Sequence, residues 1–123
     1  MPVMDLKPIM AIIIPPEGPA NIGPISQDLR TLQSTVGGYI EAVYAMHDED
    51  GRPSVTFWCN EEGKIKNLGL NRRATALWYT LSGGPTGDYL SGTVVVTGFD
   101  DGEGDMLPVP EVLVDLWNSI QPD

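Results

Sequence analysis

Cysteine and histidine are almost absent from this chain of 123 residues, which has one of each. The single cysteine, Cys59, cannot form an internal disulfide, and its apolar neighbours predict a buried strand position. With only His47, the chain lacks the clustered soft ligands that transition metals prefer, and it lacks a Ser-His-Asp or Cys-His set unless His47 is the base. We therefore expect no metal, no cofactor and no enzymatic activity.

Long hydrophobic runs are also missing. The apolar run near the N-terminus, residues 10–14, has only five residues. A run of this length is too short for a membrane span or for the core of a signal peptide. The sequence therefore predicts a cytoplasmic protein that does not enter a membrane.

Basic residues are scarce, since 7 lysines and arginines face 17 acidic residues and give a net charge of −10. Nonspecific binding to phosphate backbones depends on clusters of cations, so direct binding to nucleic acid is not expected. The acidic residues gather in two predicted loops, where they would form a surface for a host protein with a basic face. The residues of this predicted partner-binding surface are Asp48, Glu49, Asp50, Asp100, Asp101, Glu103 and Asp105.

Four segments have the β-branched and aromatic content of strands. Residues 10–14 fit a strand buried on both faces at the centre of a sheet. Residues 39–46 and 54–59 predict a hairpin with a long connection, and residues 92–98 predict a further strand. The proline-rich residues 15–24 are predicted to form a loop, because proline fixes φ.

Three segments have the apolar spacing of helices. Ser26 is predicted to cap the first, which Gly37 would end, and Asn71 is predicted to cap the second. Pro110 suits the first turn of the third. The expected buried faces are Ile25, Leu29, Leu32 and Val36 in the first helix and Val109, Val112, Leu113, Leu116, Trp117 and Ile120 in the third.

The elements give one small α+β domain over residues 1–123. We expect a mostly antiparallel sheet of about four strands with two to three helices. The order is strand, helix, strand, strand, helix, strand, helix. Its first six elements match the split β-α-β, ferredoxin-like topology, to which a C-terminal helix is added.

The basic segment, residues 60–77, holds four of the seven basic residues and is the one local reversal of charge. Gly63 is predicted to supply a positive φ in a turn before the second helix. Arg72 and Arg73 fall in the first turn of that helix, where cations oppose the helix dipole. A placement that costs stability calls for a compensating interaction.

Two interactions would compensate for these arginines. One is internal pairing with the acidic residues Glu61, Glu62 or Asp88. The other is an anionic ligand, bound by guanidinium groups and the amides at the helix start. The ligand site would then consist of Asn71, Arg72, Arg73 and Tyr39, with Trp78 as a second aromatic residue for stacking.

Three sequence blocks resemble a family called domain of unknown function 3846. They are residues 32–41 (LQSTVGGYIE), residues 60–64 (NEEGK) leading to 70–75 (LNRRAT), and residues 92–98 (GTVVVTG). Members of that family occur in actinobacteria, plasmids and bacteriophages, so the resemblance implies an accessory protein of a mobile element in a bacterial host cell. It implies no activity and no catalytic residues. The proline-rich insert before Ser26 and the acidic tail after Phe99 depart from the family pattern.

Three functions are consistent with the sequence. The first is a small acidic accessory protein, encoded by a phage or mobile element, that binds and modulates a host protein as a nucleic-acid mimic. The second is a protein that binds a nucleotide or another small anion at Asn71, Arg72 and Arg73. The third is a structural, virion-associated homo-oligomer, in which exposed Trp58 or Trp117 would seal a subunit interface.

Overall fold

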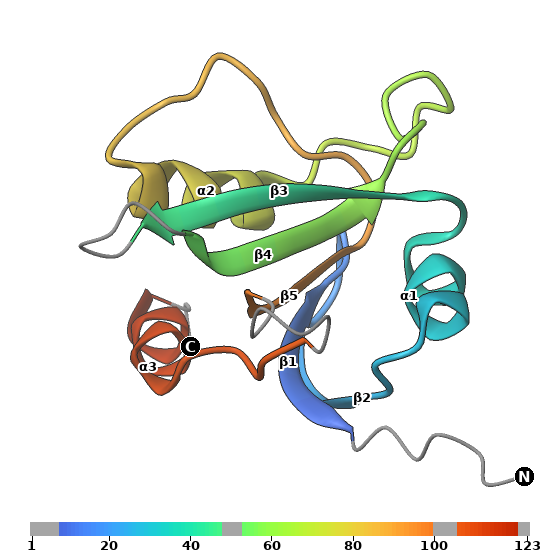
Figure 1. Cartoon of the computed structure of the whole chain (residues 1–123). Helices are drawn as coiled ribbons and strands as arrows, with labels where there is room; N and C mark the ends of the chain where they lie inside the picture. Colours follow the sequence, from blue (N-terminus) through green and yellow to red (C-terminus); the bar gives the residue numbers. More distant parts are fainter. Residues whose placement is uncertain (1–7, 48–52, 100–105, 121–123) are drawn as a thin grey trace, which may run out of the picture.

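The computed structural model describes residues 8–47, 53–99 and 106–120 (Figure 1). These residues form five strands and three helices. In chain order they are β1 (Ile9–Ile14), β2 (Asn21–Ile25), α1 (Leu29–Val36), β3 (Ile40–His47), β4 (Pro53–Asn60), α2 (Arg72–Ser82), β5 (Val94–Gly98) and α3 (Glu111–Ile120).

All five strands belong to one antiparallel sheet, in the order β2-β1-β5-β4-β3. The central pair joins distant parts of the chain, with Ile12 of β1 opposite Val96 of β5. Every residue of β5 is buried, as its central position requires. The first and last strands in chain order, β1 and β5, are therefore paired in the middle of the sheet.

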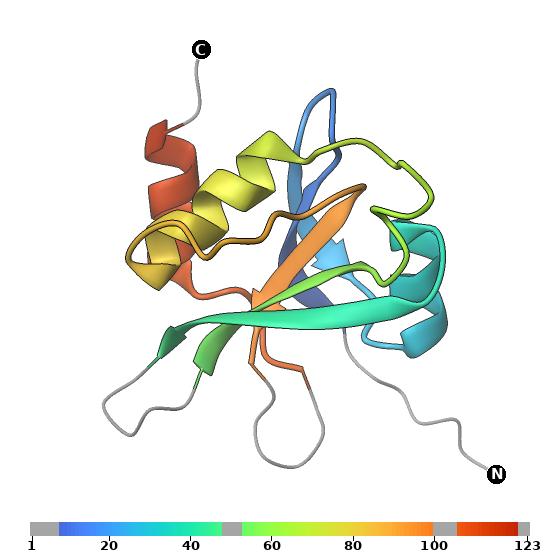
Figure 2. The same cartoon turned by 90° about the horizontal axis from the view of Figure 1, so that it is seen from above.

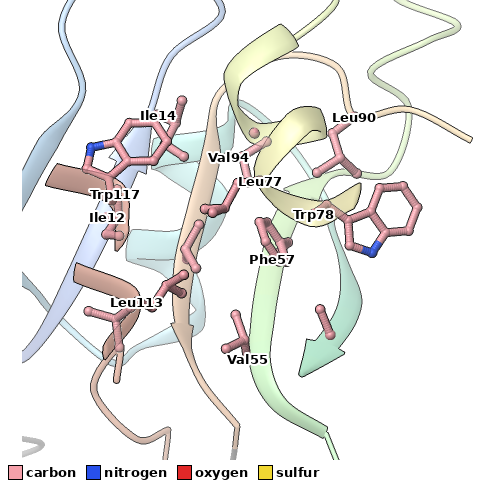
Figure 3. Close-up of a cluster of buried hydrophobic side chains, with 14 of the residues drawn as sticks. Ile12, Ile14, Val55, Phe57, Leu77, Trp78, Leu90, Val94, Leu113 and Trp117 are labelled. Carbon is pink, nitrogen blue, oxygen red and sulfur yellow. The ribbon is translucent and has the colours of Figure 1, made fainter. Parts of the chain in front are cut away.

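Helices cover both faces of the sheet. On one face, Leu77 of α2 and Trp117 of α3 pack in the same buried cluster as Phe57 of β4 (Figure 3). On the other face, Leu32 and Val36 of α1 pack in a cluster with Val95 of β5 and residues of β1 and β2. Alternation along β5 sends Val94 and Val96 to the first cluster and Val95 to the second.

The α+β class and the antiparallel sheet are confirmed, but the ferredoxin-like strand order is wrong. In a split β-α-β fold the first and third strands are parallel neighbours, and both helices lie on one face. The third predicted strand corresponds to β4, and here β5 separates it from β1. In addition, α1 packs on the face opposite α2. The prediction of a loop over residues 15–24 is also wrong, because Asn21–Ile25 form β2. Pro24 is tolerated there because β2 is an edge strand.

The start of α1 also differs from the prediction. Asp28, and not Ser26, is the cap, and its carboxylate accepts from the backbone N–H of Thr31 at 2.7 Å. Ser26 instead donates its hydroxyl to Asp28. This hydroxyl bond, followed by the bonds from Thr31, lowers the pKa of Asp28 to about 2. Gly37 ends the helix in a left-handed conformation, as predicted.

Two predicted apolar faces are only partly correct. Ile25 belongs to β2, and Leu29 of α1 is 57% exposed. In α3, Leu113 and Trp117 are buried as predicted, whereas Val112 is 62% exposed. The side chain of Ile120 lies outside the described part of the structure. Helices α1 and α3 therefore each pack against the sheet through a narrower face than their apolar residues indicate.

The tryptophans belong to the packing of the fold itself. Trp117 and Trp78 are buried in the core. Trp58 is half-buried, and its indole N–H donates to the hydroxyl of Thr97 at 2.9 Å. Trp117 is therefore not exposed as predicted, Trp58 is exposed only in part, and the predicted homo-oligomer stays a prediction. Within the described residues, none of the helices has the length and apolar character needed to span a membrane.

Replacing Asp28 by asparagine tests the acid sensitivity of the α1 cap. The pKa of Asp28 in the folded protein, about 2, lies below its ordinary value of 3.8. Ionised Asp28 thus stabilises the fold above that ordinary value, and the stabilisation is lost as the pH falls toward the folded-state pKa. Asp28→Asn keeps a capping oxygen but does not titrate. Below about pH 4, which is close to the unperturbed pKa of aspartate, we expect the melting temperature to fall less steeply with pH in Asp28→Asn than in the natural protein.

The control is Asp115→Asn, which changes an exposed aspartate of α3. Its melting temperature should follow that of the natural protein across the same pH range. Identical slopes for Asp28→Asn and the natural protein would contradict the proposed role of the Asp28 carboxylate.

Candidate functional site

The loop between β4 and α2, residues 61–71, contains Lys64 and Lys66 of the basic segment. Turns fold it back on itself, since the N–H of Leu68 donates to the carbonyl of Gly63 at 2.9 Å. The loop is attached to the segment before β5, where the N–H of Gly92 donates to the carbonyl of Gly69 at 2.8 Å. Loop and segment both lie beside α2 (Figures 1 and 2).

A pocket of about 620 Å³ lies between this loop, α2 and residues 89–91. We call it the α2 pocket. Its size is within the range of sites that hold small organic ligands. It is lined by Gly63, Lys64, Asn67, Gly69, Leu70, Arg72, Thr75, Ala76, Tyr79, Tyr89 and Ser91. The lining thus combines two cationic side chains with aromatic and aliphatic walls.

The two cations of the pocket have different environments. Lys64 forms an ion pair with Asp88, and its Nζ lies 4.4 Å from the centre of the Tyr89 ring. The bond between Lys64 and Asp88 raises the pKa of Lys64 and lowers the pKa of Asp88. Arg72 is exposed and has no ion pair within the described residues. Its guanidinium is therefore the cation that is available to a ligand.

The start of α2 adds to the positive potential at Arg72. Its first turn contains no acidic residue, so no side chain there neutralises the positive end of the helix dipole. The backbone amides of this turn and the Arg72 guanidinium favour the same charge, that of an anion. An anionic group is the ligand chemistry that this end of the pocket stabilises.

The wall opposite the loop is held by hydrogen bonds to α2. The hydroxyl of Tyr79 donates to the carbonyl of Asp88. The hydroxyl of Thr75 accepts from the N–H of Leu90 at 3.0 Å. These bonds keep Tyr89, which is 44% exposed, at the mouth of the pocket. The fold therefore holds this wall of the pocket in place, and the wall carries a partly exposed aromatic ring.

Asn71, a predicted ligand residue, is fully buried and is used by the fold. Its amide donates to the carbonyl of Ile14 at 2.7 Å and to the carbonyl of Gly92 at 2.8 Å. Its oxygen accepts from the N–H of Ala74 at 3.0 Å, which confirms Asn71 as the cap of α2. Both donors are occupied, so the side chain has none left for a ligand.

Arg73 and Tyr39, the other predicted ligand residues, lie away from the pocket lining. Arg73 donates to the backbone carbonyls of Pro15, at 2.8 Å, and Gly18, and thereby holds the β1–β2 connection. Tyr39 is 68% exposed and directly precedes β3. Of the four residues predicted for a ligand site, the structure brings only Arg72 into the α2 pocket.

The predicted pairing of the arginines with acidic residues is wrong within the described residues. Asp88 pairs with Lys64, and Glu62 pairs with Lys66 at 3.5 Å. Gly63 does not have a positive φ, whereas Asn67 in the same loop has a φ of 55°. Gly63 is required for a different reason, since an added Cβ would lie 3.1 Å from the carbonyl oxygen of Ser91.

Sequence reasoning missed Lys64, Tyr79 and Tyr89 as pocket residues. The charge of the basic segment was a usable signal for Lys64. No local pattern could place Tyr89 beside it, because their contact depends on the return of the chain past α2. The position of the tyrosines in this pocket therefore depends on the tertiary fold.

Cys59 is buried, as predicted. Burial, together with the negative charge of Glu41, raises the pKa of the Cys59 thiol to about 12. Among the described residues, no three His, Cys, Asp or Glu side chains come together where they could hold a metal ion. The predicted acidic surface, Asp48, Glu49, Asp50, Asp100, Asp101, Glu103 and Asp105, lies outside the described residues and stays a prediction.

Removal of the Asn71 side chain should unfold much of the structure around the pocket. Asn71→Ala leaves two carbonyls and one N–H without their buried partner, so we expect a loss of about 3–5 kcal/mol in the free energy of unfolding. Urea denaturation measures this loss. The control, Asn118→Ala at an exposed position of α3, should change it by less than about 0.5 kcal/mol. Equal stabilities of the two variants would contradict the capping role.

A comparison with protein families identifies the family of this chain. The model of the family described as domain of unknown function (DUF3846) matches residues 9–119, which include all the described strands and nearly all of α3. No curated protein and no solved structure matches the chain. The matched region covers the α2 pocket as well as the sheet. The chain therefore belongs to the DUF3846 family.

Proposed function

We propose that the protein is a binding protein whose α2 pocket captures an anionic group carried on an apolar or aromatic body. The observation that carries this proposal is Arg72, an exposed cation that lines the pocket and has no ion pair among the residues that the structure describes. The pocket is a local exception to the net charge of −10 on the whole chain, which would otherwise repel anions.

The walls of the pocket support the second half of the proposal. Tyr79, Tyr89 and Leu70 provide aromatic and aliphatic surface on which a planar or apolar body can be buried. A nucleotide and an aromatic carboxylate both have this combination. We propose binding without catalysis, since the buried Cys59 thiol is unreactive and Lys64 is already paired with Asp88.

Arg72→Ala tests the proposal. The natural protein is expected to show a rise in melting temperature with millimolar nucleoside monophosphates or aromatic carboxylates. Loss of a charged hydrogen bond costs about 1.5–3 kcal/mol, so the affinity should fall about 10- to 100-fold in Arg72→Ala. Titration of the anions, monitored by differential scanning fluorimetry, measures both the rise in melting temperature and the affinity.

Arg30→Ala is the matched control, because Arg30 is an exposed arginine of α1 on the other side of the sheet. It should bind the anions as the natural protein does. A rise in melting temperature that is unchanged in Arg72→Ala would refute the assignment of the pocket.

A second proposal is favoured by the charge of the whole chain. A net charge of −10 suits a protein that binds a basic protein surface as a nucleic-acid mimic. The family resemblance implies that such a protein would be encoded by a phage or mobile element and would act in the cytoplasm of a bacterial host. The acidic residues of the two loops predicted from the sequence would carry this function. It needs a basic partner, whereas the α2 pocket needs an anionic one, so the two proposals are separable.

The mimic proposal is tested by charge reversal at Asp100, Asp101, Glu103 and Asp105. Affinity capture from a bacterial host lysate at low salt should recover a nucleic-acid-handling protein. High salt and the four-site variant should each abolish the recovery, because an exposed charged interface is screened. Recovery that is unchanged by the four substitutions would exclude the acidic loops as the interface.

A further inference from the structure

A second hollow adjoins the α2 pocket. This hollow, of about 740 Å³, is lined by Pro16, Glu17, Leu68, Gly69, Leu70 and Arg72. Three residues, Gly69, Leu70 and Arg72, line both spaces. Arg72 therefore stands between two adjoining hollows, which we call together the α2 groove. Either hollow alone has the volume of a site for a small ligand, so the groove as a whole suits a longer one.

Apolar side chains are exposed along the loop that borders the groove. Ile65 is 84% exposed, Leu70 is 45% exposed and Leu68 is 36% exposed. Single exposed apolar residues are ordinary, but these three fall within six consecutive positions of one loop. Tyr89 adds a fourth on the facing wall. A partner that covers this rim would remove apolar area from water.

Charge varies along the groove in a fixed order. Lys64 lines the α2 pocket but not the second hollow, Arg72 lines both, and Glu17 lines the second hollow but not the α2 pocket. Lys64 is held by Asp88, so the net attraction for an anion centres on Arg72. Near Glu17 an anion is repelled and an N–H or cationic group is favoured. The groove is thus complementary to a ligand with one carboxylate and separate apolar and donor groups.

We propose that the α2 groove binds an extended acidic and apolar peptide segment of a partner protein. A carboxylate of the segment would bind the Arg72 guanidinium, and a neighbouring large apolar side chain would enter the α2 pocket beside Tyr79 and Tyr89. The backbone or a basic side chain would lie toward Glu17. This inference rests on the proposed function, because it identifies the anionic group of that proposal as part of a peptide.

A phage-displayed library of random heptapeptides tests the inference. The library is selected on the immobilised natural protein and counter-selected on Arg72→Glu. We expect enrichment of Asp or Glu next to Leu, Phe, Tyr or Trp. A synthetic peptide of the consensus sequence should bind the Arg72→Glu variant at least about tenfold more weakly, as loss of a charged contact predicts. Arg30→Glu, with the same change of charge on α1, should bind as the natural protein does.

Glu17→Lys gives an independent test, since it reverses the charge of the second hollow while Arg72 is intact. Consensus peptides extended with an acidic residue at one end should gain affinity for this variant, and those extended with a lysine should lose it. The end at which this exchange occurs gives the direction of the peptide in the groove. Equal effects at both ends, or no effect, would contradict the proposed charge order.

Three results would overturn the inference. One is a library without an acidic and apolar consensus, and another is a consensus peptide that binds Arg72→Glu unchanged. The third is a concentration-dependent dimer of the natural protein that Arg72→Glu abolishes, which would place a second copy of the chain in the groove. If small organic anions still raise the melting temperature through Arg72, the proposed function stands without the peptide. If they do not, both fail.

Discussion

The buried amide of Asn71 is the interaction on which the site depends. It joins the start of α2 to the end of β1 and to Gly92 before β5. These three segments are distant in sequence, and their relative position decides where the loop of residues 61–71 meets residues 89–91. Because its polar atoms are all paired inside the core, Asn71 fixes this junction at one geometry. Arg72 is the next residue, so its position at the pocket follows from the same junction.

Local sequence signals predicted most of the elements, and the errors arose where the structure depends on tertiary context. The β3–β4 hairpin, α2 with its Asn71 cap and the α1 stop at Gly37 all depend on residues that are close in sequence. The β2 strand was missed because its proline and glycine indicate a loop, although both are acceptable in an edge strand. The strand order was missed because it depends on pairing between β1 and β5, for which no short-range pattern exists.

The site was predictable only in part. The unfavourable position of Arg72 in a helix first turn was a real signal, and the structure places that side chain on a pocket. The same signal for Arg73 had an ordinary explanation, since two backbone carbonyls accept its donors. Every residue has a backbone carbonyl, so the sequence does not mark which ones accept from Arg73. Sequence reasoning that looked for Glu61, Glu62 or Asp88 could not find them. The aromatic walls came from residues that only the fold brings together.

The central pairing of β1 with β5 also has a kinetic consequence. Ile12 and Val96 come into contact only after the long chain segment between β1 and β5 has brought the two strands together. The core of the sheet thus has a high contact order, and closing it requires the entropy of a very long loop to be overcome before any central contact forms. Formation of the β3–β4 hairpin and α2 is local and precedes this step in such a scheme. We therefore expect folding of this small domain to be slow for its size, with the α2 groove completed in the last step.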